Sequence, residues 1–554
     1  MRLDGARSFR AANACTRRGA AQRDRTLLLA WIATALLAAC GASDEAGGDS
    51  GAGGGGEPGG NQVVAGNAAT GAGVGGGAPP EEELESSFTA PVATGNLVWI
   101  ANPVSGRVAY IDARTLEVRV TFAGNQPTYL AAVPDGEDDV ALVLNVASND
   151  ATLLRANRST GELSTRTYAV PDAGNTWAMA PDGQWAIAWT DARAIESADP
   201  IDGFQDISVL DLSGDGKSTS LTVGYRPVAV AFDEEGRRAF AVTQDGITVI
   251  DLEGDSPQVV ENVALTGDPL ESTLTRDVAI TPDGAWALVR RDGDATVTVH
   301  SLEDGSRTDV VLPGPATDLD LSADGSVAVV VVRDGGFVAL LPIPEIAESP
   351  EDYESFTVDD VVVGSAALAQ ESSTGFLYTN AVPSPVLTIF DAADESPEPR
   401  SLLLRAPVAA VFPTPGAEHA VVLHAAFELG ATGYPGAVSV VPISANLPPK
   451  IVGLDAKTIA IALAPNGEEA LVAIGDRDLG KYGFVALHMP SLQVDAYSLG
   501  SLPISAGIVA GANRGYVSQE HPDGRITFID FATDEVRTLT GFELAAQVVD
   551  GGVQ

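Results

Sequence analysis

One stretch of the chain, residues 278–305, contains three short runs in which apolar and polar residues alternate between tight turns. The runs are Val278–Thr281, Trp286–Val289 and Ala295–Leu302, and a fourth, Thr308–Leu312, follows after another turn. Alternation over four to eight residues, bounded by Pro, Asp and Gly, is typical of short antiparallel strands. Because four such strands cannot bury both faces of their sheet alone, the unit needs neighbours of its own kind.

Related units recur along most of the chain, and a glycine in the turn between the first two strands marks each of them. Successive marker glycines are 41 to 53 residues apart. A period of about 47 residues with four strands per unit is typical of propeller blades. The turns are PDG or relatives of it, in which Gly supplies a positive φ angle. The markers are Gly95, Gly136, Gly183, Gly236, Gly284, Gly325, Gly375, Gly416, Gly467 and Gly515.

The third strand of many units ends in an apolar residue followed by Asp, as at Asp112, Asp211, Asp251 and Asp530. With the turn glycines, these strand ends resemble the YVTN-type and WD40-like repeats of bacterial exported proteins, from about Gly95 to the end of the chain. The resemblance implies an all-β fold, a β-propeller of four-stranded antiparallel blades with about ten units. We expect one ring because no linker-like break separates the units; two smaller propellers are the alternative.

The two ends of the repeat region indicate how the ring closes. The segment before the first unit, FTAPVATG, has Pro91 in its middle, and Pro removes a donor from an interior strand. The C-terminal stretch Leu544–Gly552 is typical of an innermost strand but has no unit behind it. We therefore expect this C-terminal strand to complete the first blade and close the ring, which hides sheet edges that invite aggregation.

The N-terminus predicts export and a lipid anchor. Four arginines between residues 17 and 25 precede an apolar run, residues 27–39, that is too short to span a bilayer comfortably. The segment Leu-Ala-Ala-Cys that ends at Cys40 resembles the lipobox of bacterial lipoproteins. The resemblance implies cleavage before Cys40, lipidation of Cys40 and, with Gly41 in place of Asp, sorting to the outer membrane of the cell envelope. A short uncleaved anchor is the alternative.

The chain therefore divides into three parts. Residues 1–39 are the lipoprotein signal peptide, residues 40–94 are the lipidated cysteine and a Gly-rich, acidic tether, and residues 95–554 are the β-propeller. The tether has too little apolar surface to offset its chain entropy, so we expect it to be flexible. Some 40 residues of such a chain reach on the order of 35 Å.

The formal net charge is −43. A phosphate backbone needs a basic surface, so we predict no nucleic-acid partner. A well-solvated surface explains the acidity most simply. Recruitment of cations or of a basic partner is the other explanation.

The sequence contains no pattern that predicts catalysis. There are five histidines, and His419 and His424 lie at an odd spacing on one strand, which puts them on opposite faces of a sheet. Neither HExxH, CxxC nor GxSxG occurs. We predict no catalytic residue and no cofactor. Propeller lactonases and redox subunits share the architecture, so an enzyme that acts in the central channel is the alternative.

Calcium is the one ion that the sequence suggests, because two loops place several carboxylates near glycine. Neither loop matches the D-x-[DN]-x-[DN]-G pattern, so ordinary turns are the simpler interpretation. A calcium-stabilised structural protein is a further alternative. The candidate ligands are Asp199, Asp202, Asp206, Asp211 and Asp215.

Two loops between second and third strands are unusually long, residues 191–205 and residues 425–436. Harmless insertion explains them at little entropic cost. The alternative is a binding rim, in which Phe204, Phe427 and Tyr434 are the aromatic anchors. We predict a membrane-anchored, exported lipoprotein that binds a protein or another envelope component through the loop face of its propeller, without catalysis.

Overall fold

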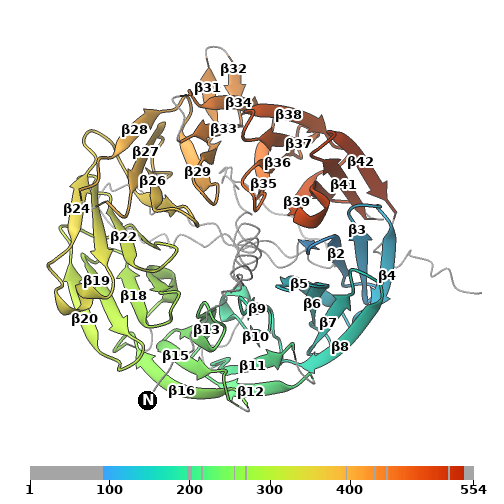
Figure 1. The fold of residues 1–554 in the computed structure, drawn as a ribbon, viewed down its shortest axis with the longest axis horizontal. Coiled ribbons are helices and arrows are strands. Elements are labelled where there is room, and N and C mark those ends of the chain that lie inside the picture. The colour runs from blue at the N-terminus through green and yellow to red at the C-terminus, as the bar shows by residue number, and fades with distance from the viewer. Residues whose placement is uncertain are drawn as a thin grey trace, which may run out of the picture.

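The computed structural model describes residues 91–195, 202–213, 216–254, 256–268, 271–394, 396–429, 432–443, 447–521 and 524–541. Ten four-stranded antiparallel sheets form a single closed ring around a central axis, so the predicted ten-bladed propeller is confirmed (Figure 1). Consecutive strands pair within each blade, except that β30 pairs with β33 in blade 8.

The strands of blades 1 to 5 are β1 (Val92–Ala93), β2 (Leu97–Asn102), β3 (Arg107–Asp112), β4 (Val118–Phe122), β5 (Pro127–Val133), β6 (Asp139–Asn145), β7 (Asp150–Ala156), β8 (Leu163–Ala169), β9 (Thr176–Met179), β10 (Trp185–Trp189), β11 (Asp206–Asp211), β12 (Ser218–Thr222), β13 (Pro227–Phe232), β14 (Arg238–Thr243), β15 (Gly246–Asp251), β16 (Gln258–Ala264), β17 (Arg276–Ile280), β18 (Trp286–Arg291), β19 (Thr296–Ser301) and β20 (Arg307–Val311).

The strands of blades 6 to 10 are β21 (Asp318–Leu321), β22 (Val327–Val332), β23 (Phe337–Pro342), β24 (Glu354–Thr357), β25 (Ser365–Leu368), β26 (Thr374–Tyr378), β27 (Val386–Asp391), β28 (Arg400–Leu403), β29 (Val408–Pro413), β30 (His419–His424), β33 (Gly436–Pro442), β34 (Lys450–Leu454), β35 (Lys457–Leu463), β36 (Glu469–Asp476), β37 (Lys481–His488), β38 (Gln493–Ser498), β39 (Pro503–Val509), β40 (Arg514–Gln519), β41 (Arg525–Asp530) and β42 (Glu535–Thr540). A separate hairpin pairs β31 (Phe427–Leu429) with β32 (Thr432–Tyr434).

Each blade runs from a first strand beside the axis to a fourth strand on the rim (Figure 1). The second and third strands are covered on both faces by neighbouring blades, so they are apolar almost throughout. All seven residues of β6 are buried, whereas the rim strand β8 exposes most of its side chains. The hydrophobic core therefore lies between blades, as in the cluster that joins blades 5 and 6 around Leu288 and Val330.

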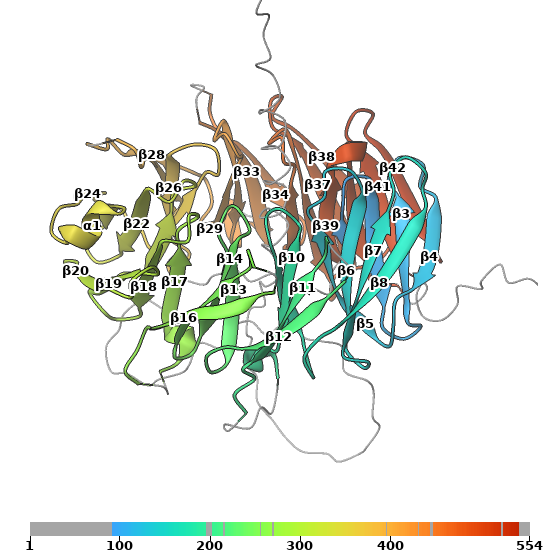
Figure 2. The same ribbon diagram turned by 60° about the horizontal axis from the view of Figure 1, so that its bottom comes forward.

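The ring has two faces, which differ in the connections that they carry (Figure 2). We call the face with the first-to-second and third-to-fourth strand connections the turn face. The loop face carries the second-to-third strand connections and the passages between blades. The only α-helix in the described residues is α1 (Glu345–Glu348), and the 3-10 turns are η2 (Ala192–Ala194), η3 (Thr273–Thr275) and η4 (Ala510–Ala512). None of the described helices is long and apolar enough to cross a membrane.

The marker glycines identify one unit each, but their backbone roles differ. Gly183 has a φ of 71° and also lies against the preceding blade, where a Cβ atom would collide with the carbonyl oxygen of Pro134. In blades 8 and 10 the positive φ belongs instead to Ala417 (57°) and Asn513 (48°). Gly95, Gly136 and Gly375 do not have a positive φ, and Gly375 lies within β26, so the turn between the first two strands is not built in the same way in every unit.

Blades 1 and 10 meet where the chain ends of the ring come together (Figure 1). The strand that pairs with β2 is β1, which reaches the inner edge of blade 1 from the N-terminal side of the predicted boundary at residue 95. The prediction that the C-terminal strand completes blade 1 is therefore wrong, because β1 already occupies the inner edge of that blade. Residues 544–552 themselves lie outside the described residues. Within the described residues, side chains join the two blades. The Tyr516 hydroxyl donates to the carbonyl oxygen of Pro91 at 2.9 Å, and Arg514 donates to that of Ala113 at 2.6 Å.

Candidate functional site

The long loop of blade 8 forms the β31–β32 hairpin, which projects beyond the rim of the ring (Figure 1). Phe427 and Tyr434 are a directly opposed pair on its two strands, and their rings stack with centroids 5.3 Å apart at 18°. The Tyr434 ring also lies against Gly453 of β34, where a Cβ atom would collide with it. Both aromatic side chains are half-buried. They hold the hairpin against the blade and leave part of each ring at the surface.

Near Phe204, the end of the long loop of blade 3 is hydrogen-bonded to the connection that leads to blade 4. This residue has a φ of 44° and is half-buried. The Arg226 amide donates to the carbonyl oxygen of Gly203 at 2.8 Å, and the Arg226 side chain donates to that of Asp202 at 3.0 Å. The loop end therefore has a defined position on the loop face.

The structure does not bring the three predicted aromatic anchors together. Phe204 belongs to blade 3, whereas Phe427 and Tyr434 belong to blade 8, which lies across the ring (Figure 1). The two long loops are therefore separate features of the loop face.

Exposed large apolar side chains gather on the loop face. The sequence did not predict this feature. Single exposed apolar residues are normal on any protein, but their distribution over the two faces is uneven. Eight lie in loop-face connections or at the loop-face ends of strands: Val104, Phe122, Leu274, Val311, Val362, Leu403, Leu479 and Ile504. The other two in the described residues, Val260 and Leu447, lie elsewhere. Alternation within each strand gave no signal because most of these residues are in connections or at strand ends.

The turn face is rich in charges that pair with one another. Between blades 1 and 2, a hollow of about 80 Å³ is lined by Arg114, Arg119 and Arg158 among others. Each of these arginines forms an ion pair, with Asp112, Glu117 and Asp139 respectively, at distances of 3.0 to 3.3 Å. Burial alone would raise the pKa of Asp112, but hydrogen bonds from Arg114 and from backbone amides lower it overall. The hollow has little room and no unsatisfied charge with which to attract a ligand.

Three of the predicted calcium ligands, Asp202, Asp206 and Asp211, lie in the described residues, and they do not form a cluster there. Asp206 and Asp211 stand at opposite ends of β11. Asp206 accepts a hydrogen bond from the Thr222 hydroxyl at 3.0 Å, and Asp211 accepts one from the Ser213 amide at 3.1 Å. Asp202 is exposed. Asp199 and Asp215 lie outside the described residues, as does Cys40, the predicted site of lipidation.

The histidines have different surroundings. His424 is buried at the end of β30, where Nδ1 lies 3.0 Å from the carbonyl oxygen of Ala406 and Nε2 lies 2.7 Å from the Ser439 hydroxyl. Burial lowers the pKa of His424. His300 is buried in β19, and its Nε2 atom has no hydrogen-bond partner. Burial lowers its pKa to about 4. Both histidines are therefore neutral at pH 7.

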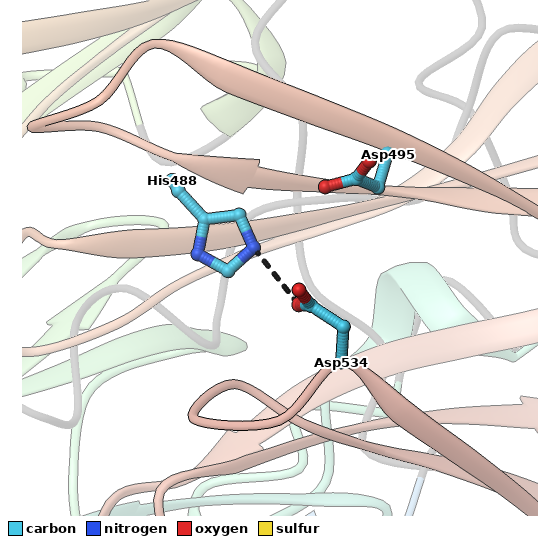
Figure 3. Close-up of side chains that lie close together, drawn as sticks. All are labelled: His488, Asp495 and Asp534. Atoms are coloured by element: carbon cyan, nitrogen blue, oxygen red, sulfur yellow. Dashed lines mark ion pairs between the residues drawn. The ribbon is translucent and has the colours of Figure 1, made fainter.

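His488 lies in a cluster that sequence analysis did not predict. It is the last residue of β37, and its imidazole faces the carboxylates of Asp495 and Asp534 (Figure 3). One potential ligand atom from each side chain lies within 4.8 Å of the others. Asp534 belongs to the next blade, so no local spacing in the sequence links it to His488. It is the one such group of three found in the described part of the chain.

No protein-family model and no curated protein matches the chain. Solved structures resemble the chain at low sequence identity. Hydrazine synthase of Kuenenia stuttgartiensis has a TM-score of 0.34 and 15% identity over 57% of this chain and 95% of its own. A eukaryotic initiation factor has a TM-score of 0.49 and 12% identity, and the match covers 72% of this chain and 97% of the other. Dihydro-heme d1 dehydrogenase NirN in complex with DHE has a TM-score of 0.38 and 13% identity, and the match covers 74% of each chain. Likenesses this distant identify neither an activity nor a partner for the present chain.

Proposed function

We propose that the protein is an exported lipoprotein, anchored through Cys40 to the outer membrane, that binds a partner protein through the loop face of its propeller without catalysing a reaction. The observation that carries the binding role is the concentration of exposed large apolar side chains on that face. Apolar side chains at a surface favour association because their burial removes them from water, at about 25 cal/mol per Å².

The apolar residues on the loop face fall into two arcs. One arc, in blades 9, 10 and 1, contains Leu479, Ile504, Val104 and Phe122. The second arc runs from the start of blade 5 to blade 7, and contains Leu274, Val311, Val362 and Leu403. A protein partner is favoured because several spaced apolar contacts on a rigid ring suit an extended surface better than they suit a small molecule.

The anchoring role is supported by the order of basic region, apolar run and cysteine at the N-terminus. Acyl chains contribute about 0.8 kcal/mol per buried methylene, so several chains on one cysteine would hold the protein on a membrane. Metabolic labelling with a radioactive fatty acid tests this role. We expect label on the wild type and none on Cys40→Ser, which should leave the membrane fraction. Equal labelling of both would overturn the anchor.

The binding role is tested by substituting one arc at a time with serine. The first variant carries Val104→Ser, Phe122→Ser, Leu479→Ser and Ile504→Ser, and the second carries the four changes of the other arc. The control, Val260→Ser with Leu447→Ser, removes exposed apolar side chains outside the loop face. After cross-linking in intact cells, we expect at least one arc variant to lose a protein that the wild type and the control both retain. Identical cross-linked proteins in all four samples would overturn the loop-face proposal.

A further inference from the structure

The cluster of His488, Asp495 and Asp534 joins two blades on the turn face. His488 ends β37 and Asp495 lies on β38, so both belong to blade 9, whereas Asp534 lies in the turn between β41 and β42 of blade 10. The three side chains converge on one space (Figure 3). We propose that this space binds a divalent transition metal ion of the Zn²⁺ type, which links blade 9 to blade 10. The proposal does not depend on the loop face.

The two facing atoms of His488 and Asp534 are separated by a distance that suits two ligands of one ion. Nε2 of His488 lies 3.3 Å from Oδ1 of Asp534, yet the contact is not a hydrogen bond, and Nε2 is buried without any other partner. A direct hydrogen bond would be shorter and nearly linear. Tetrahedral Zn²⁺ with bonds of about 2.0 to 2.2 Å instead separates neighbouring ligand atoms by roughly 3.3 to 3.6 Å. Both lone pairs would then point at the ion and not at each other.

Neighbouring side chains orient two of the ligands. Gln493 donates a hydrogen bond of 2.6 Å to Oδ2 of Asp495, and the Phe531 ring packs edge-on against His488, with centroids 6.2 Å apart at 88°. Such support is what gives metal sites their geometry. Asp495 offers a carboxylate oxygen within 4.8 Å of the ligand atoms of His488 and Asp534.

The charge in the cluster also favours a cation. In the described part of the chain, Asp495 forms no ion pair, and His488 is the only basic side chain that pairs with Asp534. Glu469 lies directly opposite His488 in the sheet, and its Oε2 atom is buried without a hydrogen-bond partner. A dication would neutralise the aspartates, and an imidazole ligand suits Zn²⁺ better than it suits Ca²⁺ or Mg²⁺, which prefer oxygen.

The site is tested on the full-length, tag-free protein after treatment with a chelator. We expect calorimetric titration with Zn²⁺ to show one saturable site per chain that Mg²⁺ does not compete for. Asp534→Asn and His488→Ala should each weaken this binding at least tenfold, and circular dichroism verifies that both variants fold. His419→Ala is the control, because His419 lies beside Glu418 in blade 8, away from the cluster.

Cobalt gives a second readout that weak binding to surface carboxylates does not mimic. With Co²⁺ in place of Zn²⁺, we expect the intense visible absorption of a four-coordinate site in the wild type and in His419→Ala. The absorption should be absent from His488→Ala. If Zn²⁺ affinity and the cobalt spectrum are the same in His488→Ala as in the wild type, the proposed site is wrong.

Discussion

A buried hydroxyl on the third strand recurs in most blades and explains several polar residues inside an otherwise apolar fold. Thr152 and Thr527 accept hydrogen bonds from Asn145 and Gln519, at 3.0 and 2.7 Å, and the Ser439 hydroxyl lies 2.7 Å from Nε2 of His424. Asn145, Gln519 and His424 are each the last residue of the second strand in the same blade. Because a buried polar group is costly unless it is paired, each hydroxyl and its partner stabilise the blade only as a pair. His424 is therefore a structural residue.

His300 breaks this pattern, and its isolation predicts how the protein responds to acid. Its side chain is buried without a partner for Nε2, and its pKa falls from 6.5 to about 4. The unfolded chain therefore binds a proton between pH 6.5 and pH 4 that the folded chain does not, so stability is present above pH 6.5 and is lost as the pH falls towards 4. At pH 5 we expect this residue to lower the free energy of unfolding by about 1 to 2 kcal/mol relative to its value above pH 6.5.

The measurement is the urea unfolding midpoint at pH 7.5 and at pH 5. His300→Leu should reduce the loss between the two pH values, because leucine fills a similar volume and takes up no proton. His521→Gln, in the connection between β40 and β41, is the matched control and should behave as the wild type does. An unchanged pH dependence in His300→Leu would show that another group is responsible.

At the scale of elements, the blades could be predicted from the sequence and the meetings between blades could not. Alternation and turn residues are local, so they located strands such as β18 and β19. Phe427 and Tyr434 stack within a single loop, so both residues could also be predicted from the local sequence. The His488 cluster depends instead on Asp534 of another blade. Its position follows from the rotation between adjacent blades, which no spacing along the chain records.

The turn glycines give the clearest test of packing between blades. Gly183 and Gly480 both have a positive φ, 71° and 60°, but only Gly183 lies against another blade. Gly480→Ala should therefore cost only the backbone strain, about 1 to 2 kcal/mol. Gly183→Ala must also displace Pro134, and we expect about 1 to 3 kcal/mol more. Thermal unfolding of both variants measures the difference; equal losses would mean that the turns of neighbouring blades are not in tight contact.

At the scale of the whole molecule, the contact between blades 10 and 1 is unlike the others. A chain connection joins every other neighbouring pair, whereas these two blades are held, in the described residues, by side chains and by one backbone hydrogen bond of 2.8 Å from Gly511 to Gly95. The apolar cluster at this contact includes Ile100, Tyr516 and Phe528. Opening the ring here breaks only non-covalent contacts, so local opening should occur at this contact first.

Two matched tyrosines test whether the ring opens between blades 10 and 1. Tyr516 is fully buried and donates to Pro91 across this contact, whereas Tyr168 is buried and donates to the carbonyl oxygen of Asp211 across the chain-linked contact of blades 2 and 3. Replacing either tyrosine by alanine should cost about 3 to 5 kcal/mol. Only Tyr516→Ala should speed hydrogen exchange selectively in β2, β3, β40 and β41, because blades 2 and 3 remain tethered by their connection. If Tyr168→Ala speeds hydrogen exchange at the contact of blades 2 and 3 as much as Tyr516→Ala does at the contact of blades 10 and 1, the chain connection does not stabilise its contact. The proposal that the ring opens first between blades 10 and 1 is then wrong.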